Sequence, residues 1–210
     1  PVSTWAAENT PLEITADTAL EWNQKNKTYV ARGNALAKQG DLSVTADTLT
    51  ATYAGQDGSS SDIILLEANG KVTLTSGDNI AIGDKVVYDL TTGKAILSGT
   101  RPKITQGTKN TLEADEILVW TKKSDNSPSD GTLDHAEAIG NVVITSGQQV
   151  ATGNKATYQA DTNMAELIGN VQVKQGDNWL QGNRAEMNMT TQVSKMFGDK
   201  TDFCDMEVRR

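Results

Sequence analysis

The segment AELIGNVQVKQGDNWLQGNRAEM, residues 165–187, repeats a pattern that occurs twice earlier in the chain. DHAEAIGNVVITSGQQVATGNKATY, residues 134–158, and TYVARGNALAKQGDLSVTADTLTATY, residues 28–53, show the same order of features. Each has Gly-Asn, then Gln-Gly or Ser-Gly, and then Ala-Asp or Gly-Asn. Self-similarity at nearly fixed spacing predicts a repeat architecture.

Two anchors define the period of the repeat. The first is a small residue followed by Asp or Asn, at Ala16-Asp17, Ala46-Asp47, Gly83-Asp84, Ala114-Asp115, Gly153-Asn154 and Gly182-Asn183. The second is a glycine, at Gly33, Gly70, Gly99, Gly140, Gly169 and Gly198. The distance from the first anchor to the next glycine is 15 or 16 residues, except for two intervals of 23 and 25. We therefore expect six repeats of about 30 residues in a single domain at 11–210, after a flexible tail at 1–10.

The two long intervals contain exposed loops. Segments 53–62 and 122–131 are rich in Gly, Ser and Asp, and the second also contains Pro, a composition typical of loops. Tight turns are expected at the matching places of the other repeats, at 89–94 and 160–163. Insertions at one position of a repeat predict that the loops lie on one edge of the architecture.

Within a repeat the apolar residues alternate, which predicts half-buried strands. In the segment 169–176, Val171 and Val173 fall on one face of the strand, whereas Gln172 and Lys174 fall on the other. Apolar residues stand three positions before the Asp or Asn of the first anchor and two positions after it. An odd number on one side and an even number on the other means that the apolar residues change from one face of the strand to the other at the anchor. A change of face beside a small residue indicates a bulge or a sharp bend, so the chain is expected to turn a corner once in each repeat.

Short polar side chains at the corner are expected to satisfy backbone groups. A calcium repeat needs several oxygen ligands at each site, whereas here a single Asp alternates with Asn. Lys85, Lys155 and Arg184 follow the anchor directly. No metal site is therefore expected.

Six stacked strand-corner-strand units bury one apolar face between two sheets or within one folded sheet. The side chains of this face are mostly small, so we expect an apolar groove and not a dense core. The predicted groove residues are Ile14, Ala19, Val44, Leu49, Val72, Leu74, Val86, Leu112, Ile117, Val142, Ile144, Val171 and Val173.

The first strand, at 11–17, would leave backbone groups unpaired at one end of the stack. It alternates freely and carries no lysine, one of the residues with which exposed edge strands are protected. Strand addition to a partner is expected there, at Leu12, Glu13, Ile14 and Thr15. The alternative is an edge covered by the tail 1–10.

Composition excludes several other functions. A net charge of -8 argues against nucleic acid, which demands a basic surface. The one cysteine, Cys204, cannot form an intrachain disulfide framework, and no apolar run approaches the length of a membrane span. His135 is the only histidine and has no recognisable nucleophile nearby in sequence. Neither an enzyme nor a cofactor is expected.

Several segments of the chain resemble a known family. PLEITAD at 11–17, YVARGN at 29–34, QG at 39–40, TAD at 45–47 and IGDKVVY at 82–88 are similar to the LptA/OstA-like family of periplasmic lipopolysaccharide-transport proteins. The resemblance spans about residues 11–200. It implies an open-ended antiparallel β-jellyroll of V-shaped strands that stacks end to end and binds lipopolysaccharide, through the acyl chains of lipid A, in a continuous apolar channel.

The resemblance also implies partners and location. The N-terminal strand would dock on an inner-membrane LptC-like protein, and the C-terminal strand would dock on another copy or on an outer-membrane LptD-like translocon. The protein would be periplasmic, with a signal peptide removed before Pro1.

The sequence departs from the family pattern in two places and leaves three alternatives open. Pro102 interrupts the third repeat, where an edge or a bulge is expected. The last repeat, 197–210, lacks the apolar pair after its glycine. The chain could also be an LptC-like domain, the N-terminal domain of an LptD-like translocon, or a ligand-free self-assembling β-stack. Lys85, Arg101 and Lys103 are expected to be solvated surface charges.

Overall fold

The computed structural model describes residues 13–39, 41–55, 63–108, 110–122, 133–188, 190–191 and 193–198. All regular secondary structure in these ranges is β-strand. The strands are β1 (Glu13–Thr15), β2 (Ala19–Asn23), β3 (Thr28–Gln39), β4 (Leu42–Tyr53), β5 (Ile63–Ser76), β6 (Asn79–Asp89), β7 (Lys94–Ser98), β8 (Lys103–Gln106), β9 (Asn110–Glu113), β10 (Glu116–Thr121), β11 (Leu133–Ser146), β12 (Gln149–Gln159), β13 (Met164–Gln175), β14 (Asn178–Asn188) and β15 (Val193–Phe197). Across the described ranges, no helix has the length and apolar character needed to cross a membrane.

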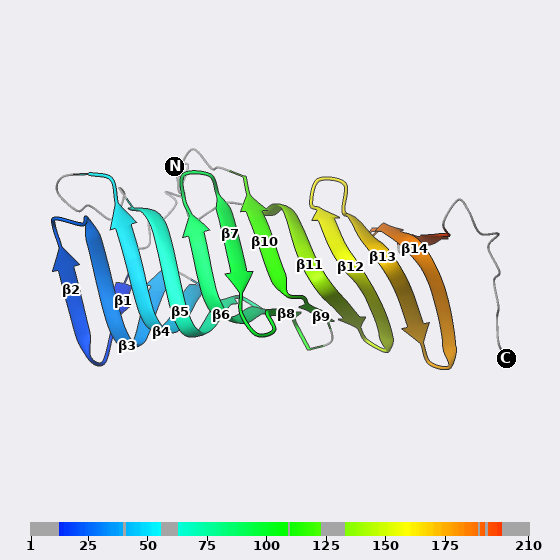
Figure 1. Cartoon of the computed structure of the whole chain (residues 1–210), viewed down its shortest axis with the longest axis horizontal. Coiled ribbons are helices and arrows are strands. Elements are labelled where there is room, and N and C mark those ends of the chain that lie inside the picture. The colour runs from blue at the N-terminus through cyan, green and yellow to red at the C-terminus, as the bar shows by residue number, and fades with distance from the viewer. Residues whose placement is uncertain are drawn as a thin grey trace, which may run out of the picture.

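The strands form one antiparallel sheet that is folded along its length into two wings. The eight long strands, β3–β6 and β11–β14, contribute one half to each wing. Wing 1 is completed by β2, β7, β10 and β15, and wing 2 by β1, β8 and β9. The strands follow one another along the long axis, from β2 at one end to β14 at the other (Figure 1). The predicted open-ended antiparallel β-jellyroll of V-shaped strands is confirmed.

Each long strand bends at a bulge. The cross-strand register shifts between Asn69 and Val72, and again between Ile139 and Val142. The residues in these gaps, Gly70-Lys71 and Gly140-Asn141, all have positive φ; Gly140 has a φ of 77° and Asn141 a φ of 45°. Gly and Asn adopt the left-handed region more readily than other residues. The chain therefore turns the corner at a glycine and the residue that follows it, which is Asn34, Lys71, Asn141 or Asn170.

The two sequence anchors contact each other across neighbouring strands. A Cβ added to Gly99 would lie 2.7 Å from Asp84 Cβ, and a Cβ on Gly169 would lie 2.6 Å from Asn154 Nδ2. Asp84 also accepts hydrogen bonds from the backbone N–H (2.7 Å) and the hydroxyl (2.9 Å) of Thr100. The prediction that these side chains satisfy polar groups at the corner is thus confirmed at Asp84. The space that the corner glycine leaves open is filled in four repeats by Asp47, Asp84, Asp115 or Asn154.

This contact explains the uneven spacing of the anchors. The contacting pairs are an Asp or Asn and the next glycine, and the hairpin that joins their strands lies between them. A longer hairpin can be inserted at the far edge of wing 1 without any change at the corner, because the corner contact lies at the opposite end of the two paired strand halves. The intervals of 23 and 25 residues are the two places where this happens; the loop residues 56–62 and 123–132 themselves lie outside the described residues.

In the first repeat, the residue that faces the corner glycine lies one position after the Asp of the anchor. This shift corrects one prediction. A Cβ on Gly33 would lie 3.0 Å from Thr18 Cβ, so Thr18 and not Asp17 faces the glycine. Consequently Leu20 pairs with Ala31 on the inward face, while Ala19 pairs with Arg32 on the outward face. The prediction that Ala19 lines the groove is wrong.

The packed core lies along the line of corners at which the sheet folds. The side chains closest to the fold line are buried, including Val72, Ile117, Val142 and Val171, each at most 1% exposed. Many of their neighbours are alanines, and no buried polar or charged residue occurs among the described residues. Small side chains at the fold line allow the two halves of each strand to approach closely.

Tight turns close the hairpins at the far edges of both wings. In wing 2, Gly77, Gly147 and Gly176 have φ of 55–59° and open two-residue loops, as is typical of type II′ turns. In wing 1, the predicted turns at 89–94 and 160–163 are confirmed. Pro102 lies between β7 and β8, where the strand is interrupted, as predicted for a residue that cannot donate to a sheet.

Replacing a corner glycine should destabilise the protein more than replacing a turn glycine. Gly140→Ala places a methyl group against Asp115, whereas Gly147→Ala meets no atom within 4 Å. Both glycines have positive φ, so both variants carry a backbone cost of roughly 1–2 kcal/mol. Overpacking should add roughly 1–3 kcal/mol to the loss at Gly140 alone. Chemical denaturation measures the difference, and equal losses would contradict the corner contact.

Acid should weaken the turn at Asp89. The Thr91 and Thr92 hydrogen bonds to its carboxylate lower the pKa of Asp89 to about 2. Because the native carboxylate binds a proton less readily than the unfolded one, its stabilising effect is complete above pH ~4 and is lost as the pH falls toward 2. Asp89→Asn should lower stability at pH 7 and flatten the loss between pH 4 and 2. Parallel stability curves for the two proteins would contradict this assignment.

Candidate functional site

The inward face of wing 1 is a continuous apolar surface. Residues paired across antiparallel strands point to the same side of the sheet. The inward row nearest the corner is Leu20, Ala31, Leu49, Ala68, Val86, Leu97, Ile117, Ala138, Ala156, Leu167, Ala185 and Met196. The next inward row is Trp22, Tyr29, Ala51, Leu66, Tyr88, Ala95, Val119, Ala136, Tyr158, Ala165, Met187 and Ser194.

Wing 2 presents a matching surface. Its second inward row from the corner is Ile14, Ala37, Val44, Leu74, Ala81, Ile104, Leu112, Ile144, Ala151, Val173 and Leu180, which are all aliphatic. None of the described positions in these three rows is charged, although charged residues make up 22% of the sequence. The interior is therefore apolar from β1 and β2 to β14 and β15.

The predicted groove residues divide into two sets by depth. Val72, Val86, Ile117, Val142 and Val171 are at most 8% exposed and form the packed corner. A second set is only half-buried: Ile14, Val44, Leu49, Leu74, Leu112, Ile144 and Val173. All of these except Ile14 and Leu74 pack against the buried core cluster. Only the second set has surface to offer a ligand, because side chains of the first set are already covered by protein.

Tyrosines mark the part of wing 1 away from the corner. The chain has four tyrosines, and Tyr29, Tyr53, Tyr88 and Tyr158 all fall on the inward face of this wing. Tyr53 accepts a hydrogen bond from Trp22 Nε1 at 2.9 Å, and the Tyr158 hydroxyl donates to Asn163 Oδ1 at 2.7 Å. This row was not predicted from the sequence. The signal was present, because Tyr53, Tyr88 and Tyr158 continue the alternation two residues beyond an inward apolar residue.

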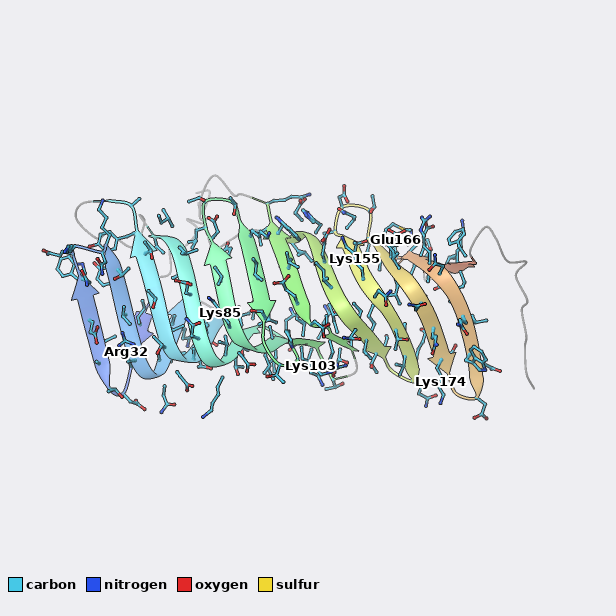
Figure 2. All side chains as sticks on the ribbon, viewed as in Figure 1. Arg32, Lys85, Lys103, Lys155, Glu166 and Lys174 are labelled. Atoms are coloured by element: carbon cyan, nitrogen blue, oxygen red, sulfur yellow. The ribbon has the colours of Figure 1, made fainter. Side chains whose placement is uncertain are left out.

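Charges lie on the outward face, where they pair. Lys155 Nζ lies 3.0 Å from Glu137, Lys85 Nζ lies 3.6 Å from Glu67, and Arg184 pairs with Glu166 and Glu186. Lys85, Lys155 and Glu166 are distributed along wing 1 (Figure 2). Exposed pairs of this kind contribute little stability, so they mainly keep the outward surface solvated.

Charged side chains also pair on the outward face of wing 2. Arg101 and Lys103 flank Glu113 at 2.6 and 3.3 Å. The hydrogen bond from Arg101, aided by Lys103, lowers the pKa of Glu113. The predicted surface role of Lys85, Arg101 and Lys103 therefore agrees with their positions.

Both ends of the described sheet leave apolar side chains uncovered. Glu13, Ile14 and Thr15 form the edge strand β1, which among the described strands pairs only with β3. Leu20 and Trp22, on edge strand β2, are 63% and 52% exposed. At the opposite end, the first half of β14 has no described neighbour beyond it. Leu12, the tail 1–10, the segment 199–210 and Cys204 lie outside the described residues.

His135 lies on the outward face and belongs to a small packed cluster. Its ring stacks on Trp120 with centroids 4.3 Å apart, and its Nδ1 lies 2.8 Å from Asp134 Oδ2. Lys94 Nζ lies 5.1 Å from the centroid of the Trp120 ring. No group of three or more His, Cys, Asp or Glu residues that could hold a metal ion occurs in the described ranges.

Comparison with known proteins assigns the family. The family model described as "LptA/(LptD N-terminal domain) LPS transport protein" matches residues 13–125 and 102–193. The chain therefore belongs to this family of lipopolysaccharide-transport proteins, as its sequence motifs predicted.

Two individual proteins are similar. An uncharacterized protein of Rhizobium meliloti (strain 1021) is 29% identical over 101 residues, which cover 46% of this chain and 54% of the relative. The chain thus spans about half the length of that curated relative. LptH, the LptA-homologous periplasmic component of the lipopolysaccharide transport device of Pseudomonas aeruginosa, is 15% identical, with 95% of this chain and 92% of LptH covered and a TM-score of 0.24. The family assignment depends on the family model alone.

Proposed function

We propose that this protein binds the acyl chains of lipopolysaccharide between its two wings and conveys them through the periplasm. The supporting observation is the inward row second from the corner on each wing. Both rows run along the sheet, and neither has a charged residue at a described position. Acyl chains gain roughly 0.8 kcal/mol for each CH₂ group removed from water. This gain is non-directional, so a chain can slide along the rows while its head group stays in water.

The two ends of the sheet are the proposed docking sites. An inner-membrane LptC-like partner would add a strand to the β1 and β2 end, at Glu13, Ile14 and Thr15. Another copy of the chain, or an outer-membrane LptD-like protein, would add to the β14 and β15 end. Two observations support this assignment: the edge backbone has no partner among the described strands, and apolar side chains such as Leu20 and Trp22 are exposed. Strand addition would pair this backbone and cover these side chains.

A second candidate belongs to the same pathway. The matching family description includes the N-terminal domain of LptD as well as LptA, so the chain is alternatively such a domain of a translocon. Both candidates use the same interior and differ in the component that receives the lipid next. Isolation of the protein from outer-membrane and soluble periplasmic fractions distinguishes them.

Photo-crosslinking in Gram-negative envelopes tests the proposed function. A photoreactive residue in place of Leu74, Ile144 or Val173 should form lipopolysaccharide adducts, because these inward side chains are half-buried. The matched controls are Thr73, Val143 and Gln172, their outward neighbours on the same strands, which should form few adducts.

A third set of positions separates groove from corner. Val72 and Val142 are at most 1% exposed, so a photoreactive residue at these sites should capture much less lipid than at Leu74 or Ile144 in protein that remains folded. Equal labelling at inward and outward positions, or no adduct anywhere in the presence of lipid, would contradict acyl-chain binding and favour a ligand-free β-stack.

A further inference from the structure

The outermost inward row of wing 2 has a distinct chemistry. Beyond its aliphatic row, β5, β6, β8, β9 and β11–β14 end in uncharged hydrogen-bonding side chains: Ser76, Asn79, Gln106, Asn110, Ser146, Gln149, Gln175 and Asn178. The row changes character at β4, which places Leu42 beside Ser76. We call these residues the amide row. Neighbouring members are cross-strand partners, so their Cβ atoms lie about 4.5–5.5 Å apart along the rim. Ser146 Oγ donates a hydrogen bond to Asn110 Oδ1 at 2.9 Å.

A cavity opens at one part of the amide row. It has a volume of about 640 Å³, and its lining includes Asp41, Ser76, Asp78, Asn79, Gln106 and Asn110. Among the described residues that line it there is no Lys or Arg, while Asp41 and Asp78 are acidic. Carboxylates at this rim repel phosphate and other anions, but they accept hydrogen bonds from hydroxyl groups.

The row differs from an ordinary solvated edge. Lys and Glu are common on the outward face, yet none of the eight row positions is charged. Amides and hydroxyls both donate and accept hydrogen bonds, which matches the hydroxyl groups of a sugar. Neutral hydrogen bonds contribute modestly when formed, so they can be exchanged for the next pair as a bound molecule moves along the rim.

We propose that the amide row and its cavity form a saccharide-binding rim that contacts the sugar hydroxyls of an acylated saccharide, not its phosphate groups. This inference depends on the proposed function, because the acyl chains in the interior bring the sugar to the rim. It adds a specificity that the apolar rows cannot supply, since burial of CH₂ groups does not distinguish one lipid from another of equal chain length.

The test compares three lipids of matched acyl-chain length: an acylated disaccharide without phosphate, the same disaccharide with phosphate, and a fatty acid. Binding to the whole chain is measured by displacement of a fluorescent fatty acid. The double variant Gln106→Ala/Asn110→Ala removes two facing members of the row. The control is Thr105→Ala/Thr111→Ala, the pair that faces outward at adjacent positions of the same strands, β8 and β9.

We expect the amide-row variant to bind both disaccharide lipids about fivefold to tenfold more weakly and the fatty acid unchanged. The control variant should bind all three lipids as the wild type does. If the variant leaves disaccharide binding unchanged, or if only the phosphorylated lipid loses affinity, the saccharide rim is wrong while acyl binding stands. If the wild type binds none of the three lipids, the proposed function itself fails.

Discussion

The contact between a corner glycine and the side chain that faces it, an Asp or Asn in four repeats and Thr18 in the first, determines the rest of the structure. Because glycine leaves room for that side chain and accepts positive φ, β3, β5, β11 and β13 can bend where a neighbouring strand presents the facing side chain. The bends then align, and side chains on neighbouring strands stay in register on both wings. Without this alignment the inward alternation would produce separate apolar spots. With it, the alternation produces continuous rows.

Distance from the corner separates stability from binding. The residues at the fold line, such as Val142, are covered by their own neighbours and hold the wings together. Two residues further along the strand, side chains such as Ile144 are half-buried and are available to a ligand. Further still, wing 1 presents tyrosines and wing 2 presents amides. A single strand therefore passes from core to groove to rim within a few residues.

Much of this architecture could be predicted from the sequence, because the repeat and its alternation are local signals. The change of apolar parity beside the Asp or Asn anchor predicted the corner, and the Gly/Ser/Asp clusters predicted where hairpins lengthen. Three features could not be read in this way. Ala19 was misplaced because Thr18 replaces Asp17 at the corner, which only the contact with Gly33 reveals. The two depths of Val72 and Leu74 depend on the folding of the sheet, since both residues have the same parity and similar polarity. The amide row depends on cross-strand register across several repeats, which no single repeat contains.

The central claim is that acyl chains occupy the half-buried inward rows, and spin labels along β11 test it most directly. Labels would replace Val143, Ile144 and Thr145 one at a time in a Cys204→Ser background, and their accessibility to a water-soluble relaxation agent would be measured with and without lipopolysaccharide. We expect lipid to protect the label at 144 and to leave those at 143 and 145 accessible. Equal protection at all three positions, or none at 144, would contradict the claim.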